Sequence, residues 1–134
     1  MTYTIQQVSR MFQLNASTLR YYEEIGILTN VGRDQRGQRV YEQCHLNRLG
    51  TICCFKGAGM SMAQLQKFFA YEMDESQHID DILLLLSEQK QYLEDQIELL
   101  QKNGAHVEKK LHFYTAIKEA QLQGLPHPDW KDYK

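Results

Sequence analysis

Apolar residues recur along this chain at the spacing of one helix face, separated by short polar stretches. The first such run is Ile5, Val8, Met11 and Phe12. This i, i+3, i+4 spacing predicts a short amphipathic helix that ends near Phe12. Thr4 precedes the run and Gln7 follows it by three positions, a capping-box pair that starts a helix.

A second helix is predicted from Asn15 to Gly26, after a turn at Gln13–Leu14. Asn15 is a favoured N-cap residue, and Gly26 is of the type favoured just past a helix end. Two helices joined by such a turn form a helix-turn-helix, although a plain helical hairpin has the same spacing. The second helix offers side chains for a DNA groove and its phosphates; these are Ala16, Ser17, Thr18, Arg20, Tyr21 and Tyr22.

Arginines and glycines dominate the stretch from Gly32 to Tyr41. Gly37 suits a hairpin tip because glycine adopts positive φ, and Arg39–Tyr41 is the predicted returning strand. Beside a helix-turn-helix, Arg33, Arg36 and Arg39 predict a basic wing that contacts DNA. The alternative is a solvated charged loop.

Two more helices are predicted before residue 74. One runs from about Gln43 to Ala58 and ends at Gly59. The other begins at a second capping box, formed by Ser61 and Gln64.

The most regular pattern follows residues 74–76. Apolar residues alternate there at spacings of four and three, an a/d heptad seam that is interrupted only by Lys90 and Gly104: Ile79, Leu83, Leu86, Leu93, Ile97, Leu100, Val107, Leu111 and Tyr114. A helix of roughly 60 Å, at ~1.5 Å per residue, cannot bury this stripe against a small head. A second copy, parallel or antiparallel, is therefore the predicted partner. Gly104 is expected to bend or end the helix. The chain is not expected to stay helical past Pro126 and Pro128, and Trp130 in the tail is expected to dock on the body.

Composition fits a folded protein, with 43% hydrophobic and 24% charged residues in 134. Residues 1–56 carry seven Lys/Arg against four Asp/Glu, whereas residues 57–134 carry eight against thirteen. A basic front and an acidic back suit a nucleic-acid-binding head on a solvated stalk. No apolar run approaches ~20 residues and no signal peptide is evident, so we expect a cytoplasmic, nucleoid-associated protein without a membrane partner.

One set of residues is more specific than these patterns. It comprises Tyr3-Thr4-Ile5, Thr18-Leu-Arg-Tyr-Tyr-Glu-Glu-Ile-Gly-Ile-Leu28, Arg33-Asp34, Gly37, Arg39, Tyr41 and Gly59-Met-Ser61. Together, over residues 3 to about 70, they resemble the MerR family of bacterial transcription regulators. Gln38 departs from the aromatic or similar residue usual after the wing glycine. Glu42 departs from the usual Ser/Thr cap of the third helix.

The resemblance implies phosphate contacts for Arg20, Tyr21 and Arg39, base contacts for Ala16 to Thr18, and a place for Lys56 near a second wing. Family members bind as dimers to a palindrome in an overlong promoter spacer and distort it so that RNA polymerase engages. The expected fold is mainly α, with a winged helix-turn-helix head at 1–73. A long antiparallel coiled-coil dimerisation helix at 74–122 and a tail at 123–134 complete it. We expect Tyr22, Arg33, Arg36 and Tyr41 to add to the DNA-binding surface.

The three cysteines, Cys44, Cys53 and Cys54, are an odd number with two adjacent, which fits a reducing compartment and no disulfide framework. The segment around Cys54 is similar to the thiol-dependent aldehyde-stress regulators of the family, the NmlR/AdhR-like group. The similarity implies electrophile or redox sensing at Cys54. By helical geometry Cys53 is predicted to be a core residue, and Cys44 lies in a first turn where the helix dipole lowers a thiol pKa. Inert packing of all three remains open.

Other functions have less support in the sequence. The histidines at 78, 106, 112 and 127 have no metal-ligand spacing, so no metal or cofactor is expected. The thiols lack a His/Asp partner pattern, which argues against an enzyme. A family-like regulator that answers an unidentified small molecule or metal, and a coiled-coil interaction protein, remain as alternatives.

Overall fold

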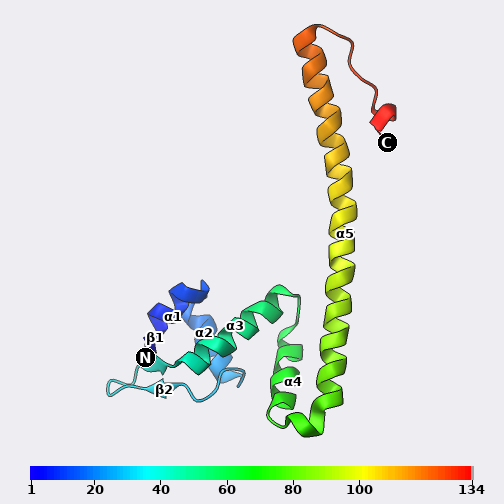
Figure 1. The fold of residues 1–134 in the computed structure, drawn as a ribbon. Coiled ribbons are helices and arrows are strands. Elements are labelled where there is room, and N and C mark those ends of the chain that lie inside the picture. Colours follow the sequence, from blue (N-terminus) through cyan, green and yellow to red (C-terminus); the bar gives the residue numbers. More distant parts are fainter. Residues whose placement is uncertain (134) are drawn as a thin grey trace. The chain divides into compact units, whose positions relative to one another are not determined.

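The computed structural model describes residues 1–133 and divides the chain into two compact units. The first unit is Met1–Lys90, and the second begins at Gln91. Within residues 1–133 there are five α-helices and three short strands. Figure 1 shows their order along the chain, and one helix, α5, begins in the first unit and ends in the second.

The helix-turn-helix consists of α1 (Ile5–Phe12) and α2 (Ala16–Glu24). The predicted capping box of α1 is present, because Thr4 and Gln7 exchange side-chain and backbone hydrogen bonds of 2.8 and 3.1 Å. Asn15 occupies the N-cap of α2 as predicted, but its side chain makes no capping hydrogen bond. Gly26, with φ of 84°, adopts the left-handed conformation just past the end of α2.

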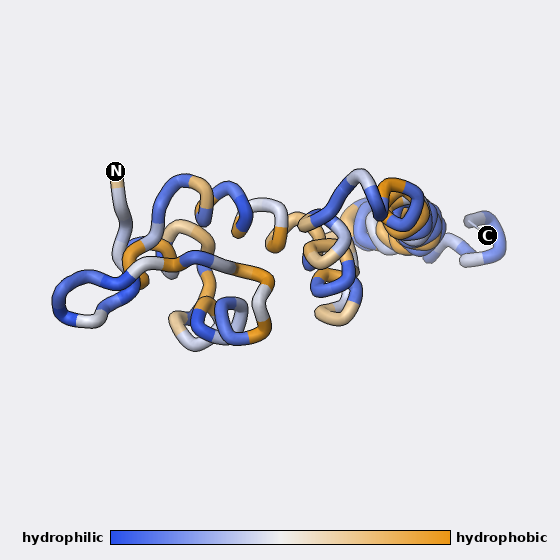
Figure 2. The backbone as a smooth tube through the Cα atoms, turned by 90° about the horizontal axis from the view of Figure 1, so that it is seen from below, coloured by the Kyte–Doolittle hydropathy of each residue, from blue (hydrophilic) through white to orange (hydrophobic). Residues whose placement is uncertain are grey.

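The wing is part of a three-stranded antiparallel sheet of β1 (Tyr3–Thr4), β3 (Arg39–Tyr41) and β2 (Gly32–Arg33), in that order. The hairpin of β2 and β3 was expected from the sequence, whereas β1 was not, because two residues are too few for an alternating pattern. Gly37 has φ of 78°, as the hairpin tip requires. Figure 2 shows the wing as a hydrophilic loop.

The core of the first unit is completed by α3 (Gln43–Gly57) and α4 (Met62–Glu72). Apolar residues of every helix of the head meet there; among the fully buried ones are Val8, Leu19, Ile27, Leu28, Leu49, Ile52 and Leu65. The capping box of Ser61 and Gln64 starts α4 as predicted. The guanidinium of Arg48 also connects α3 to α4, because it lies 3.9 Å from the Phe69 ring centroid and pairs with the Glu72 carboxylate at 3.2 Å.

The long helix α5 spans Glu75–Gln123, with non-helical backbone angles at His78. Its first turns pack against the core of the head through Ile82, Leu85 and Leu86. Gly104 does not end this helix, contrary to one of the two expectations for it. A glycine within a helix costs only about 1 kcal/mol, which the neighbouring helical residues outweigh.

The second unit folds its tail back on its own helix. Trp130 contacts the ring of Phe113 at a centroid distance of 5.2 Å, and the Lys110 ammonium lies 3.7 Å from the Trp130 ring centroid. A short 3-10 helix at Trp130–Tyr133 carries this cluster. Trp130 therefore docks on the last third of α5.

Candidate nucleic-acid interface

The start of α2 presents the small residues that were predicted to face bases. Ser17 is exposed, and Ala16 and Thr18 are half-buried. One turn later, Arg20 and Tyr21 are exposed, Tyr21 to 45%. The helix-turn-helix therefore leaves polar and basic side chains uncovered at the beginning and along one side of α2.

Two of the predicted DNA contacts lie in the core. Tyr22 is 6% exposed and Tyr41 is fully buried, and burial raises the pKa of both phenols. Tyr22 stands three positions after the buried Leu19, so the helical period alone places it on the inner face. The Tyr41 hydroxyl has no hydrogen-bond partner among the described residues. A buried side chain has no surface for DNA, so packing is the role that the structure gives to these two tyrosines.

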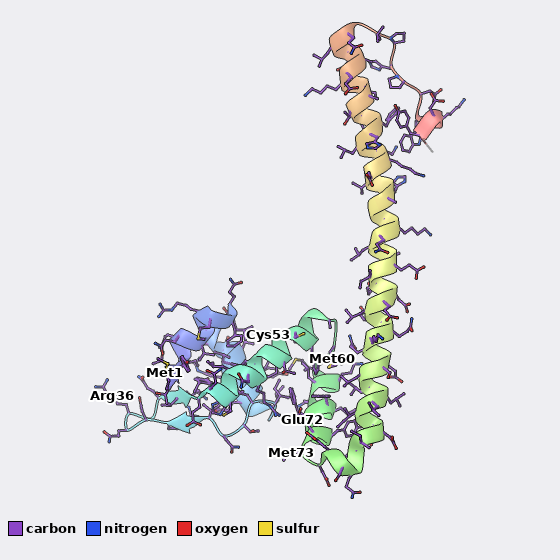
Figure 3. All side chains as sticks on the ribbon, in the orientation of Figure 1. Met1, Arg36, Cys53, Met60, Glu72 and Met73 are labelled. Carbon is purple, nitrogen blue, oxygen red and sulfur yellow. The ribbon has the colours of Figure 1, made fainter. Side chains whose placement is uncertain are left out.

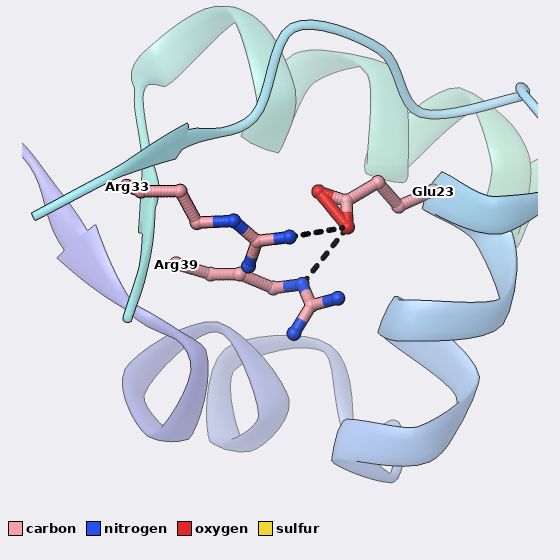
Figure 4. A network of polar contacts seen from close by, with 3 residues as sticks. All are labelled: Glu23, Arg33 and Arg39. Carbon is pink, nitrogen blue, oxygen red and sulfur yellow. Dashed lines mark hydrogen bonds and ion pairs between the residues drawn. The ribbon is translucent and has the colours of Figure 1, made fainter. Parts of the chain in front are cut away.

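The wing carries its arginines around a hydrogen-bonded turn, with Arg33 and Arg36 exposed and Arg39 half-buried. The Asp34 carboxylate accepts hydrogen bonds from the backbone N–H groups of Arg36 and Gln38, each at 2.9 Å. Arg36 extends from the wing tip (Figure 3). Arg33 and Arg39 are ion-paired to Glu23 of α2, at 3.5 and 2.9 Å (Figure 4). Sequence reasoning missed the role of Glu23, because it lies ten and sixteen positions before Arg33 and Arg39 and no local pattern connects them.

A cavity of 230 Å³ lies between the wing and the N-terminus of α1. Arg20 and Arg39 line it, as do Ile5, Gln6 and the wing tip. The N–H groups of Ile5 and Gln6 belong to the first helical turn, where no intrahelical acceptor is available. Two guanidinium groups and a helix N-terminus make this cavity chemically suited to a phosphate.

Lys56 lies on a different element from the cavity. It is an exposed residue in the last turn of α3. The ammonium is accessible to a ligand, and nothing in the cavity involves it.

The three cysteines are free and differ in exposure. Cys44, in the first turn of α3, and Cys54 are exposed. Cys53 is half-buried, and burial raises the pKa of its thiol. Its charge also contributes, after burial, to the raised pKa of Tyr22, so Cys53 lies close to the inner face of α2.

A group of possible metal ligands was not anticipated. Glu42, Cys44 and His45 have ligand atoms within 4.8 Å of one another. However, His45 is buried and both of its ring nitrogens are engaged. Its Nδ1 accepts the Glu42 N–H at 2.9 Å, and its Nε2 lies 3.1 Å from the Thr29 carbonyl oxygen. Because both ring nitrogens make these bonds, the imidazole stabilises the start of α3 and has no nitrogen available for a metal.

The predicted dimerisation seam is largely uncovered in the single chain. Its residues Ile79, Leu83, Ile97, Leu100, Val107 and Leu111 are 51–69% exposed. Leu93 is half-buried, as is Leu86, which packs against the core of the head. Among residues 1–133, no helix has the length and apolar content to cross a membrane.

Comparison with known proteins gives a consistent result. The family model of the MerR helix-turn-helix regulatory proteins matches residues 3–72. A helix-turn-helix transcriptional regulator of Haemophilus influenzae is 33% identical over 118 residues, 88% of this chain and 87% of the relative. AdhR of Bacillus subtilis is 30% identical over 66% of this chain and 64% of its own. The crystal structure of HiNmlR, a MerR family regulator lacking the sensor domain, bound to promoter DNA, superposes with a TM-score of 0.81 at 32% identity, covering 93% of this chain and 92% of that one.

Proposed function

This chain belongs to the MerR family of helix-turn-helix transcriptional regulators, and from that premise we propose that it binds a palindromic promoter spacer as a homodimer. By distorting the spacer it controls access of RNA polymerase. The known DNA complex of HiNmlR, a structural relative over most of the chain, supports DNA as the ligand.

One observation is the main support for DNA binding by the head. Arg20 and Arg39 line the same cavity as the first turn of α1, although they come from α2 and β3. Charged donors that converge on one cavity from separate elements suit a phosphate, which accepts several charge-assisted hydrogen bonds at once. Ser17 and its neighbours at the start of α2 are then placed to face bases.

Binding to promoter fragments from the chain's own genome tests the proposal. Arg20→Ala is expected to weaken binding on every fragment and to lower the salt dependence by about one phosphate contact. Arg10→Ala is the matched control, because Arg10 is an exposed arginine of α1 that does not line the cavity. Equal losses in both variants, or no binding by the unaltered protein, would contradict the proposal.

The dimer follows from the uncovered seam of α5. An exposed apolar stripe of this length is stable in water only when another helix covers it. A second copy supplies an identical stripe, and two heads on one seam match the two halves of a palindrome.

For the signal, we propose modification of Cys54 by an electrophile such as an aldehyde. Its exposed thiol lies in the last turn of α3, and its carbonyl oxygen accepts the N–H of Ala58 at 2.9 Å. Similarity to AdhR and HiNmlR is consistent with this group of regulators. Reporter induction by formaldehyde should disappear in Cys54→Ser and persist in Cys44→Ser. Induction that survives Cys54→Ser favours a regulator without cysteine sensing.

A further inference from the structure

We propose that Glu23 is a positioning residue that holds the arginines of the wing ready for a DNA phosphate. This inference rests on the proposed DNA binding. It assigns a role to a carboxylate that the interface would otherwise be expected to exclude, because a negative charge near DNA opposes binding.

The wing brings two like charges together. Arg33 of β2 and Arg39 of β3 are direct cross-strand partners in the antiparallel register. Like charges directly opposite each other destabilise a strand pair and drive the side chains apart. Without a counter-charge the two guanidinium groups would therefore spread into solvent.

Glu23 supplies that counter-charge from the last turns of α2. One oxygen, Oε2, accepts from Arg39 Nε at 2.9 Å and lies 3.5 Å from Arg33 Nη2. The side chains of Glu23 and Arg39 are only 21% and 23% exposed, so water screens this pair less than a surface pair. Figure 4 shows both arginines reaching toward the same carboxylate.

The bond to Nε leaves the outer end of Arg39 available. In Figure 4 the dashed line from Arg39 to Glu23 starts at Nε, and the two terminal amino groups of Arg39 carry no dashed line. They have no acceptor among the described residues, and Arg39 lines the 230 Å³ cavity together with Arg20. Glu23 thus binds one edge of the guanidinium and leaves the terminal donors for a phosphate.

This arrangement predicts that removing a negative charge near the DNA weakens binding instead of strengthening it. If Glu23 acted on DNA only through its charge, Glu23→Gln would remove repulsion and tighten binding. If Glu23 acts through Arg33 and Arg39, Glu23→Gln loosens the wing, and ordering it again on DNA reduces affinity.

The experiment compares Glu23→Gln with Glu24→Gln on a promoter fragment that the unaltered protein binds. Glu24 is the matched control, since it is exposed on the same helix and its side chain forms no hydrogen bond or ion pair within residues 1–133. We expect about three- to tenfold weaker binding for Glu23→Gln and unchanged or tighter binding for Glu24→Gln. Thermal unfolding of both variants, measured alongside, should stay close to that of the unaltered protein.

Two further variants separate positioning from a merely structural role. Glu23→Asp keeps the charge and should recover part of the lost affinity. In an Arg33→Gln background the cross-strand repulsion is gone, so adding Glu23→Gln should cost less than it does alone.

Binding by Glu23→Gln that equals or exceeds that of the unaltered protein overturns the inference, as does an equal loss in Glu24→Gln. If Glu23→Gln does not fold, Glu23→Asp decides, because full affinity in that shorter variant contradicts positioning. An unaltered protein that binds no fragment instead refutes the proposed function itself.

Discussion

Gln89 of α5 donates a hydrogen bond from Nε2 to the carbonyl oxygen of Ala58, the residue at the end of α3. Gln89 is buried, with 8% of its surface exposed. The Ala58 N–H in turn donates to the carbonyl oxygen of Cys54. Two consecutive hydrogen bonds therefore join the last turn of α3 to the beginning of α5, within the first unit.

Gln89→Ala is expected to lower the free energy of unfolding by about 1–3 kcal/mol, because it leaves a partly buried carbonyl without its donor. Chemical denaturation measures this change. Gln91→Ala is the matched control, since the exposed Gln91 side chain donates its hydrogen bond to the exposed Asp95. Equal stability of the two variants would show that the bond to Ala58 contributes nothing.

Tyr41→Phe should leave stability unchanged or raise it by up to about 1 kcal/mol, because the buried hydroxyl has no hydrogen-bond partner within residues 1–133 to lose. Tyr41→Ala should instead cost about 3–5 kcal/mol through the cavity that it leaves. Thermal unfolding and promoter binding are measured on both. A loss of DNA affinity in a stable Tyr41→Phe would mean that the hydroxyl reaches DNA, contrary to its position in the core.

Local signals were sufficient to predict most helix limits. Thr4, Ser61 and Gly26 act within one turn of the chain, so the sequence around each determines the cap. By contrast, the contact of Glu23 with Arg39 depends on how α2 packs against the wing. Local sequence patterns predict each element but not how the elements pack together. The boundaries predicted at 73 and 122 stay predictions, since the packing of α5 against the core continues past the first of them.

The two buried tyrosines show the same difference between features set by local sequence and features set by packing. Tyr22 lies on the same helix face as Leu19, so its burial could be predicted from the helical period. A search for residue types that contact DNA overlooks this. For Tyr41 no such period exists, because β3 is three residues long. Its burial follows from the packing of α3, where His45 makes an edge contact with its ring at a centroid distance of 6.1 Å.

Asp34→Ala is expected to weaken promoter binding about three- to tenfold, because the wing tip loses both backbone bonds to the carboxylate and becomes more mobile. Asp34→Asn keeps one side-chain oxygen that accepts such bonds, and it should retain most of the affinity. The free energy of unfolding should change by less than about 1 kcal/mol in either, as for other exposed turns. If Asp34→Asn loses as much affinity as Asp34→Ala, then charge rather than turn geometry is what matters.

Leu100→Lys is expected to dissociate the proposed dimer, because it places a charge in an apolar seam where no partner compensates it. Light scattering coupled to gel filtration gives the mass directly. Leu99→Lys is the matched control: Leu99 is 51% exposed on the same helix but lies off the a/d positions. A monomer in the Leu99 variant, or a dimer in the Leu100 variant, would place the interface on a different face of α5.

The thiols should react in an order set by exposure. At neutral pH, Cys44 and Cys54 are exposed and should be alkylated by iodoacetamide before Cys53. The thiolate is the nucleophile, and burial raises the pKa of the Cys53 thiol, so a smaller fraction of it is ionised. Its alkylation rate should keep rising at pH values above the ordinary cysteine pKa of about 8.5.

Peptide mass spectrometry over a pH series measures each rate, and Cys53→Ser and Cys54→Ser resolve the adjacent pair. If Cys53 reacts as fast as Cys54, then α3 opens on the timescale of the reaction and exposes the side chain that lies near Tyr22. An electrophile would then have a direct route to the inner face of α2, and Cys53 would replace Cys54 as the proposed sensor. Slow Cys53 and fast Cys54 leave the signal at the end of α3, where the bonds through Ala58 and Gln89 join it to α5.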